Sequence, residues 1–129
     1  MEYEGVLKRL VDYAERAVAR GAKAVILVGS LARGDYTAFS DADIIIISDE
    51  VPENPIKRIS DFMDPSLPVD VEPLVLTTEE FLKMAKEGRR IVREAIFYGK
   101  LLFGDPEIIK AASRYLEFEN GSSERWEGE

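Results

Sequence analysis

The chain has 129 residues, 46% of them hydrophobic and 33% charged, and a net charge of −8 at pH 7. This length predicts one domain, and the acidic balance disfavours tight binding of nucleic acid by this chain alone, because such binding needs clustered cations. The sequence contains neither cysteine nor histidine, so catalysis would have to use carboxylates, hydroxyls, lysine, arginine or a metal ion. The acidic start lacks a signal-peptide pattern and no apolar run could span a membrane, so we expect a soluble cytoplasmic protein.

The first third of the chain alternates between helical and strand patterns. Apolar residues at a 3.6-residue spacing predict an amphipathic helix over residues 3–20. A β-branched run then predicts a buried strand over 24–28 that leads directly into Gly29. A short helix over 31–33 should follow and end at Gly34.

Two further strands are predicted in the middle of the chain. Residues 41–48 contain four consecutive isoleucines, which indicates a strand in the centre of a sheet. After a helix predicted over 56–63, residues 69–76 alternate in the manner of a strand. Pro73 cannot donate a ladder hydrogen bond and therefore indicates an edge strand or a bulge.

The remaining pattern completes a small α/β (α+β) domain, in which helices flank a mixed β-sheet. Thr77 or Thr78 should cap a helix, and a second helix is predicted over 89–98. A short strand over 100–103 and a helix that starts at the Asp-Pro pair 105–106 and reaches about Phe118 follow. We predict a domain over 1–118 and a flexible polar tail over 119–129, in which Trp126 is the only large apolar residue.

A Gly-Ser turn lies between the first strand and the short helix. Gly29 and Ser30 can present backbone N–H groups and a hydroxyl to a phosphate, helped by the positive end of the following helix. Such a turn is common without a ligand. Arg33 could add a contact to the β- and γ-phosphates, or could instead pair with Asp35 or Asp41, and the sequence leaves both interpretations open.

Two carboxylates share one face of the isoleucine-rich strand. Asp41 and Asp43 are two residues apart, so their side chains lie on the same side, about 6.5 Å apart along the strand. This spacing suits shared magnesium ions, whereas two such carboxylates without a cation would repel each other. Ser40 is expected to orient the first aspartate. An Asp-x-Asp pair alone would more often simply face water.

The three segments 25–30, 33–35 and 40–44 together resemble the nucleotidyltransferase superfamily typified by DNA polymerase beta, and especially its small stand-alone members, the minimal nucleotidyltransferases. The pattern of that superfamily is an apolar strand, Gly-Gly or Gly-Ser, a spacer, Asp-x-Asp/Glu on the next strand and a further acidic residue on a later strand. The third acid maps onto Asp70 or Glu72, and Asp70 is preferred because Pro73 makes the backbone beside Glu72 less regular.

The resemblance implies the fold of that superfamily and a set of site residues. The implied catalytic and metal-binding residues, which would hold two Mg²⁺ ions, are Asp41, Asp43 and Asp70. The implied nucleotide-binding residues are Gly29, Ser30, Arg33 and Ser40. The implied reaction transfers a nucleoside monophosphate, AMP from ATP, to an acceptor hydroxyl and releases pyrophosphate.

The acceptor is expected to come from another molecule, because the chain has no room for a separate acceptor domain. The resemblance implies a small helical partner of the HEPN type and an antitoxin role in which that partner is modified, and a second copy of this chain is the other source. The alternative to an enzyme is a nucleotide-binding regulatory or assembly subunit without turnover, and a third possibility is an α/β domain without a nucleotide site.

One helix carries a basic stripe composed of Arg89, Arg90 and Arg93. The stripe could receive a phosphate or an acidic partner. A solvated face balanced by Glu87 and Glu94 is the preferred interpretation.

Overall fold

The computed structural model describes residues 2–121 and arranges them as one sheet covered by helices on both faces. The four strands are β1 (Ala22–Val28), β2 (Ala42–Ser48), β3 (Val71–Leu76) and β4 (Lys100–Gly104), in the order β3-β2-β1-β4. β1 is antiparallel to β2 and β4, and β2 is parallel to β3. The predicted mixed sheet flanked by helices is confirmed.

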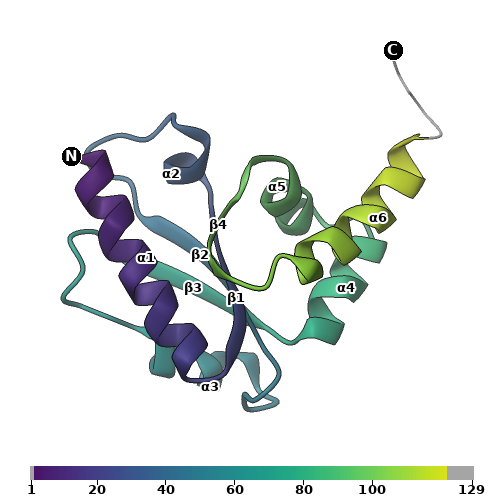
Figure 1. The fold of residues 1–129 in the computed structure, drawn as a ribbon, viewed down its shortest axis with the longest axis horizontal. Helices are drawn as coiled ribbons and strands as arrows, with labels where there is room; N and C mark the ends of the chain where they lie inside the picture. The colour runs from purple at the N-terminus through teal and green to yellow at the C-terminus, as the bar shows by residue number, and fades with distance from the viewer. Residues whose placement is uncertain (1, 122–129) are drawn as a thin grey trace.

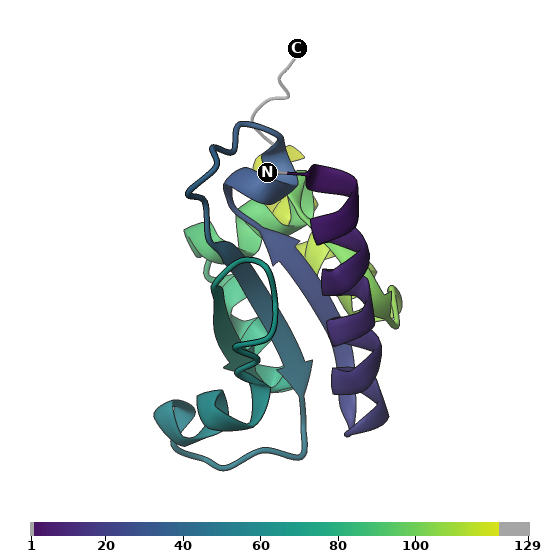
Figure 2. The same ribbon diagram turned by 90° about the vertical axis from the view of Figure 1, so that its left-hand side faces the viewer.

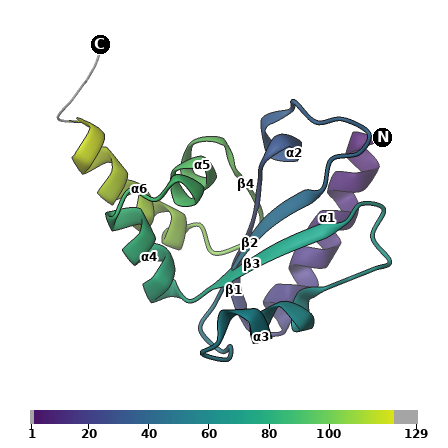
Figure 3. The same cartoon turned by 180° about the vertical axis from the view of Figure 1, so that it is seen from behind.

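The helices form two groups on opposite sides of the sheet, as Figures 1 and 3 show. α1 (Tyr3–Ala19) packs on one face together with the segment around the short helix η1 (Ser60–Phe62). The other face is covered by three helices, which are α4 (Thr78–Lys86), α5 (Arg90–Tyr98) and α6 (Glu107–Gly121). Within the described residues, no helix is both long and apolar enough to cross a membrane.

The two middle strands are buried on both faces, as the apolar runs of the sequence predicted. Side chains of β2 alternate between the two cores, with Ile44 and Ile46 facing α1 and with Ile45 and Ile47 facing α4 and α5. All four isoleucines are at most 1% exposed. Burying an aliphatic side chain of this size contributes about 1.5–3 kcal/mol, so the four isoleucines of β2 contribute strongly to the stability of the domain.

The strand β3 lies at an edge, which agrees with the prediction from Pro73. A proline costs least there, because only one side of an edge strand has to supply ladder hydrogen bonds. The helix predicted over 56–63 is shorter than expected and divides into α3 (Pro55–Ile59) and η1. The residue before a proline disfavours helical backbone, so the Asp-Pro pair at 64–65 is one physical reason for this early end.

The remaining elements differ from the predicted ranges by a few residues. α2 (Ser30–Arg33) is a single turn that ends at Gly34, and β1 starts two residues before the predicted strand. α6 continues to Gly121, beyond the predicted end near Phe118. Trp126 and most of the predicted tail lie outside the described residues, so the division at residue 118 stays a prediction.

Candidate active site

The carboxyl end of β1 meets the amino ends of β2 and β3 at one end of the sheet. Val28, the last residue of β1, is paired with Asp43 near the start of β2. Asp43 is in turn paired with Glu72 near the start of β3. Figure 2 shows α2 at this end of the sheet. Antiparallel pairing of β1 with β2 therefore brings the Gly-Ser turn against the first acidic residues of the next strand.

Position 29 requires glycine, because of its backbone conformation and because the Asp43 side chain lies against it. Its φ is +77°, which is a conformation that residues with a Cβ rarely adopt. A Cβ built on Gly29 would collide with Oδ2 of Asp43 and would come within 3.3 Å of the Cγ of that residue. The absence of a side chain at position 29 thus allows the Asp43 carboxylate to lie directly against the turn.

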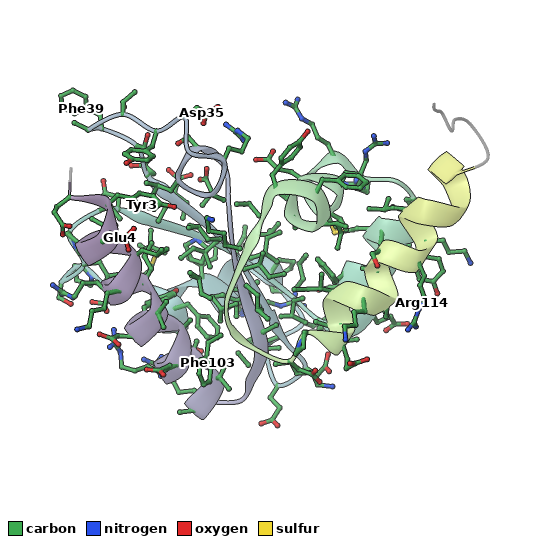
Figure 4. The ribbon with its side chains drawn as sticks, turned by 45° about the horizontal axis from the view of Figure 1, so that its top comes forward. Tyr3, Glu4, Asp35, Phe39, Phe103 and Arg114 are labelled. Carbon is green, nitrogen blue, oxygen red and sulfur yellow. The ribbon has the colours of Figure 1, made fainter. Side chains whose placement is uncertain are left out.

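Ser30 and Ser40 contact each other across the loop between α2 and β2. The Ser30 hydroxyl donates to Oγ of Ser40 at 3.1 Å, and the backbone N–H of Thr37 donates to the same oxygen at 2.8 Å. Figure 4 shows Asp35 beside α2 and Phe39 at the outer end of this loop, where its side chain is 92% exposed. Ser40 thus joins the loop to the Gly-Ser turn, one residue before Asp41.

The acidic residues of β2 and β3 repel one another at this end of the sheet. Burial raises the pKa of Asp43, and repulsion from Asp41 and Glu94 adds to the effect, whereas Arg33 opposes it. The pKa of Glu72 is also raised, first by a hydrogen bond with Asp41 and then by repulsion from Asp41 and Asp43. The site therefore concentrates negative charge that a bound cation would relieve.

Both candidates for the third acid lie beside the first two. Glu72 is the direct partner of Asp43 in the parallel ladder. The backbone N–H of Ala42 donates to the carbonyl of Asp70 at 2.8 Å, which places Asp70 next to Asp41 just before the strands begin. Repulsion from Asp70 is the smallest contribution to the raised pKa of Glu72. Glu72 therefore interacts more strongly with Asp41 and Asp43 than with Asp70.

The carboxylates do not form a closed metal cage. Among the described residues, no three carboxylates are close enough to form a ready metal site. Their oxygens are nevertheless the ligands that Mg²⁺ prefers, and Mg²⁺ commonly keeps several waters and binds through one or two carboxylates and the substrate phosphates. The donor set fits a magnesium ion that arrives with a nucleotide better than one held permanently by protein ligands alone.

Glu94 joins the site from α5, on the opposite side of the Gly-Ser turn. The backbone N–H of Gly29 donates to Oε2 of Glu94 at 3.0 Å, and Nη1 of Arg33 forms an ion pair with the same oxygen. Arg33 also contacts Oδ2 of Asp35 at 3.3 Å. The predicted pairing of Arg33 with Asp35 is thus observed, while its other partner is Glu94 rather than Asp41.

Two cavities flank Glu94. One, of about 300 Å³, reaches the acidic end of the sheet, and its lining includes Gly29, Asp43, Glu72 and Glu94. The other, of about 460 Å³, is basic and aromatic, and it is lined by Arg33, Arg90, Arg93, Glu94, Phe97 and Tyr98. Glu94 therefore separates a carboxylate-lined hollow from an arginine-lined one.

Glu94 is the site residue that sequence reasoning missed. The sequence places it among charged residues of a helix 51 positions after Asp43 (94 − 43), where it was interpreted as part of a solvated face. Its role depends on α5 packing against β1, with Val92 and Ala95 buried beside Ile26 and Val28. No local signal near position 94 predicts that contact. Of the basic stripe, Arg89 does pair with Glu87, at 3.3 Å.

Comparison with known proteins places this geometry among nucleotide-transferring domains. The family model described as a nucleotidyltransferase domain matches residues 7–115. A predicted protein adenylyltransferase of Methanocaldococcus jannaschii is 43% identical over 49 residues, which are 38% of this chain and 49% of that protein. The chain thus aligns with about half the length of this relative.

Two solved structures have a similar fold. One is a chain in a crystal structure of a toxin–antitoxin with AMP-PNP, at 18% identity and a TM-score of 0.55, with 87% of this chain and 93% of that chain covered. Another is a chain in the complex of a tri-AMPylated Shewanella oneidensis HEPN toxin with MNT antitoxin, at 17% identity and a TM-score of 0.51, with 93% of each chain covered. At these identities the likeness concerns the fold alone.

Proposed function

Because the chain belongs to the family of nucleotidyltransferase domains, we propose that it transfers AMP from ATP to an acceptor hydroxyl in a magnesium-dependent reaction. The family model spans most of the chain, so the protein is a nucleotidyltransferase. The identities of the nucleotide, the metal ion and the acceptor go beyond the family and are our proposal. The single observation that supports them best is the meeting of the Gly29 turn with the Asp43 carboxylate at one end of the sheet.

The chemistry that this arrangement supports is an in-line displacement. The acceptor hydroxyl forms a new bond to the α-phosphorus, the bond from that phosphorus to the bridging oxygen of the β-phosphate breaks, and pyrophosphate leaves. Bound Mg²⁺ would neutralise the charge that develops on the phosphate oxygens. Asp41 and Asp43 would bind that ion, Gly29 and Ser30 would bind the phosphates, and Ser40 would hold Ser30 in place.

We further propose Glu72 as the carboxylate that completes the set and accepts the proton of the attacking hydroxyl. Glu72 is the ladder partner of Asp43, and its carboxyl interacts with that of Asp41 strongly enough to raise the pKa of Glu72. Asp70, which the sequence favours, lies one position before the strand and remains the other candidate.

A protein acceptor is the choice that the relatives support. The Methanocaldococcus jannaschii relative is described as acting on protein, and one structural neighbour is a complex that contains an AMPylated HEPN toxin. We propose that this chain likewise modifies a hydroxyl side chain of a small helical partner and acts as its antitoxin. The exposed basic cavity on α5 offers a nearby surface for such a partner.

The decisive experiment is transfer of label from ATP. The protein is incubated with α-³²P-ATP, Mg²⁺ and the product of a neighbouring reading frame or a cell lysate, and acceptor labelling is followed on a gel. We expect label transfer that disappears with EDTA and with Asp43→Asn. Nucleotide binding without transfer to any acceptor would instead identify a regulatory subunit, and a lack of magnesium-dependent ATP binding would contradict the proposal.

A further inference from the structure

The Gly-Ser turn already holds a negatively charged oxygen that belongs to the protein itself. Oε2 of Glu94 accepts the backbone N–H of Gly29 at 3.0 Å and forms an ion pair with Nη1 of Arg33. One oxygen thus takes both a backbone donor at a turn and an arginine donor. The side chains of Glu94 and Arg33 are 21% and 36% exposed, so the ion pair lies at the surface while the Gly29 N–H to which Glu94 is bound is partly buried.

These two donors are the same groups that would receive a phosphate oxygen. Backbone N–H groups in tight turns and guanidinium groups are both common donors to phosphate in proteins. A carboxylate oxygen matches a phosphate oxygen in charge and in its ability to accept several hydrogen bonds. While Glu94 accepts from the Gly29 N–H and from Nη1 of Arg33, a triphosphate cannot use those two donors.

We propose that Glu94 is an internal substitute for a phosphate oxygen, which has to leave Gly29 and Arg33 before the triphosphate binds and thereby sets the affinity of the site for nucleotide. This inference rests on the proposed function, since it concerns the same site. It assigns Glu94 to control of affinity and not to the transfer step itself.

The structure provides a place for Glu94 to go. The side chain borders the basic cavity, in which Arg90 lies one helical turn earlier on the same helix. Side chains four residues apart on a helix are neighbours, so a change of rotamer can move the carboxylate from Arg33 toward Arg90. Among the residues whose side chains are described, neither Arg90 nor Arg93 forms an ion pair that would block this movement.

Binding of a polyphosphate would drive the exchange. The incoming phosphates repel the Glu94 carboxylate and offer Gly29 and Arg33 equivalent acceptors. The apparent affinity for the polyphosphate is then the affinity of the free turn multiplied by the fraction of molecules in which the turn is free. Removal of the Glu94 charge should raise that fraction, and we expect a gain of about three- to tenfold in affinity.

The test compares Glu94→Gln with wild type in titration calorimetry, using magnesium with a non-hydrolysable ATP analogue and, separately, with tripolyphosphate. We expect both probes to bind about three- to tenfold more tightly to the variant, because the gain lies in the phosphate contacts. Glu87→Gln is the matched control. It removes one negative charge from an exposed ion pair with Arg89 and should change affinity less than about twofold.

Turnover separates this role from a structural one. In the labelling reaction, Glu94→Gln should lower the KM for ATP and leave kcat nearly unchanged. If Glu94 merely ties α5 to α2, the variant binds both probes more weakly and raises KM. If Glu94 binds the metal, the loss of affinity appears with magnesium and disappears in EDTA. Either result overturns the inference.

Two further comparisons keep the result interpretable. Glu94→Ala repeats the measurement without an amide that could replace the carboxylate on Gly29, and thermal melts confirm that each variant is folded. Wild type that binds the probes while neither Glu94 variant binds them more tightly contradicts this inference alone. If no form of the protein binds either probe with magnesium, the proposed function fails together with the inference.

Discussion

The Asp43 carboxylate lies so close to Gly29 that no side chain could occupy position 29 without displacing it. The contact joins two segments that the chain separates by the whole of α2 and the following loop. It also sets the distance between the groups proposed to bind phosphate and those proposed to bind magnesium. The arrangement of the site thus depends on a single glycine more than on any other residue of the turn.

Replacement of Gly29 by alanine should therefore damage the site beyond its effect on stability. With φ +77° and ψ −159°, Gly29 occupies a backbone region that is essentially restricted to glycine and costs about 1–3 kcal/mol with a Cβ, and the new methyl group pushes Asp43 aside. A displacement of about 1 Å in a catalytic group lowers the rate by about 10²-fold, which is the loss we expect in kcat/KM. Label transfer from ATP measures the rate and thermal unfolding measures the stability.

Gly34→Ala is the matched control for this prediction. Gly34 has a φ of +94° but nothing lies within 4 Å of a Cβ built there. The control carries only the strain of a left-handed backbone, so it should lose about 1–2 kcal/mol of stability and keep most of its activity. Equal losses of activity in both variants would show that backbone strain, and not the collision with Asp43, is responsible.

Asp43→Asn should stabilise the metal-free protein at neutral pH. A carboxyl whose folded-state pKa is raised above its usual value of 3.8 contributes stability below that value and loses it as pH rises through the folded pKa. Removal of the charge restores part of this loss, and the gain is small because the carboxyl is partly exposed to solvent. Thermal melts in EDTA at pH 7 and at pH 3.5 should show a gain at pH 7 that shrinks at the lower pH.

Magnesium and a second aspartate provide the checks on that result. Added Mg²⁺ should raise the melting temperature of wild type more than that of the variant, because the ion relieves the same repulsion. Asp49→Asn should lower the stability of the fold at pH 7, whereas Asp43→Asn should raise it. The pKa of Asp49 is lowered, first by the backbone N–H of Thr78 and further by Lys23, so ionised Asp49 stabilises the fold.

The third carboxylate can be identified by paired substitutions. Glu72→Gln should lower label transfer by about 10²-fold or more, because the proposed proton acceptor is lost. Asp70→Asn should retain most of the activity. A larger loss of activity in Asp70→Asn than in Glu72→Gln would identify Asp70 as the third carboxylate. Circular dichroism of both variants would exclude unfolding as the cause.

An ion pair far from the site should control stability at low pH. The Arg58 guanidinium is 2% exposed and contacts both carboxylate oxygens of Glu80, at 2.7 and 3.3 Å. This contact and the backbone N–H of Thr77 hold the pKa of Glu80 below its usual value of 4.5. Stability from Glu80 is therefore present above pH 4.5 and is lost as pH falls through its folded pKa.

Glu80→Gln should then cost about 1–2 kcal/mol at pH 7, because it leaves Arg58 buried with only carbonyl partners, while the 40% exposure of the Glu80 side chain limits the loss. The difference from wild type should be smaller at pH 3 than at pH 7. Urea unfolding at the two pH values measures it. Glu79→Gln, which changes an exposed residue of the same helical turn, should have little effect at either pH.

Most of the fold could be predicted because local patterns and burial agree. The isoleucine run of β2, the helical stripe of α1 and the proline of β3 each indicated the place that the structure gives them. The capping box of Thr77 and Glu80 fixes the start of α4, which the sequence also indicated. Errors occur where one element gives way to the next, as in the division of the predicted helix into α3 and η1.

The site was less predictable because it depends on contacts between distant segments. Asp41 and Asp43 could be found from their spacing on one strand, and Gly29 from its position after another. Glu94 could not, since its carboxylate reaches Gly29 only after α5 has packed across the sheet. The choice between Asp70 and Glu72 likewise depends on the register of β3 against β2, which no local pattern fixes.

Pro73 affects whether another chain could pair with the edge strand β3. The unpaired backbone N–H and C=O groups of an edge strand can form hydrogen bonds with a strand of another chain. Pro73 removes a donor in the middle of β3, next to Glu72, so such growth of the sheet is interrupted beside the acidic residues. The backbone of β3 closest to the carboxylates is thereby a poor template for a fifth strand.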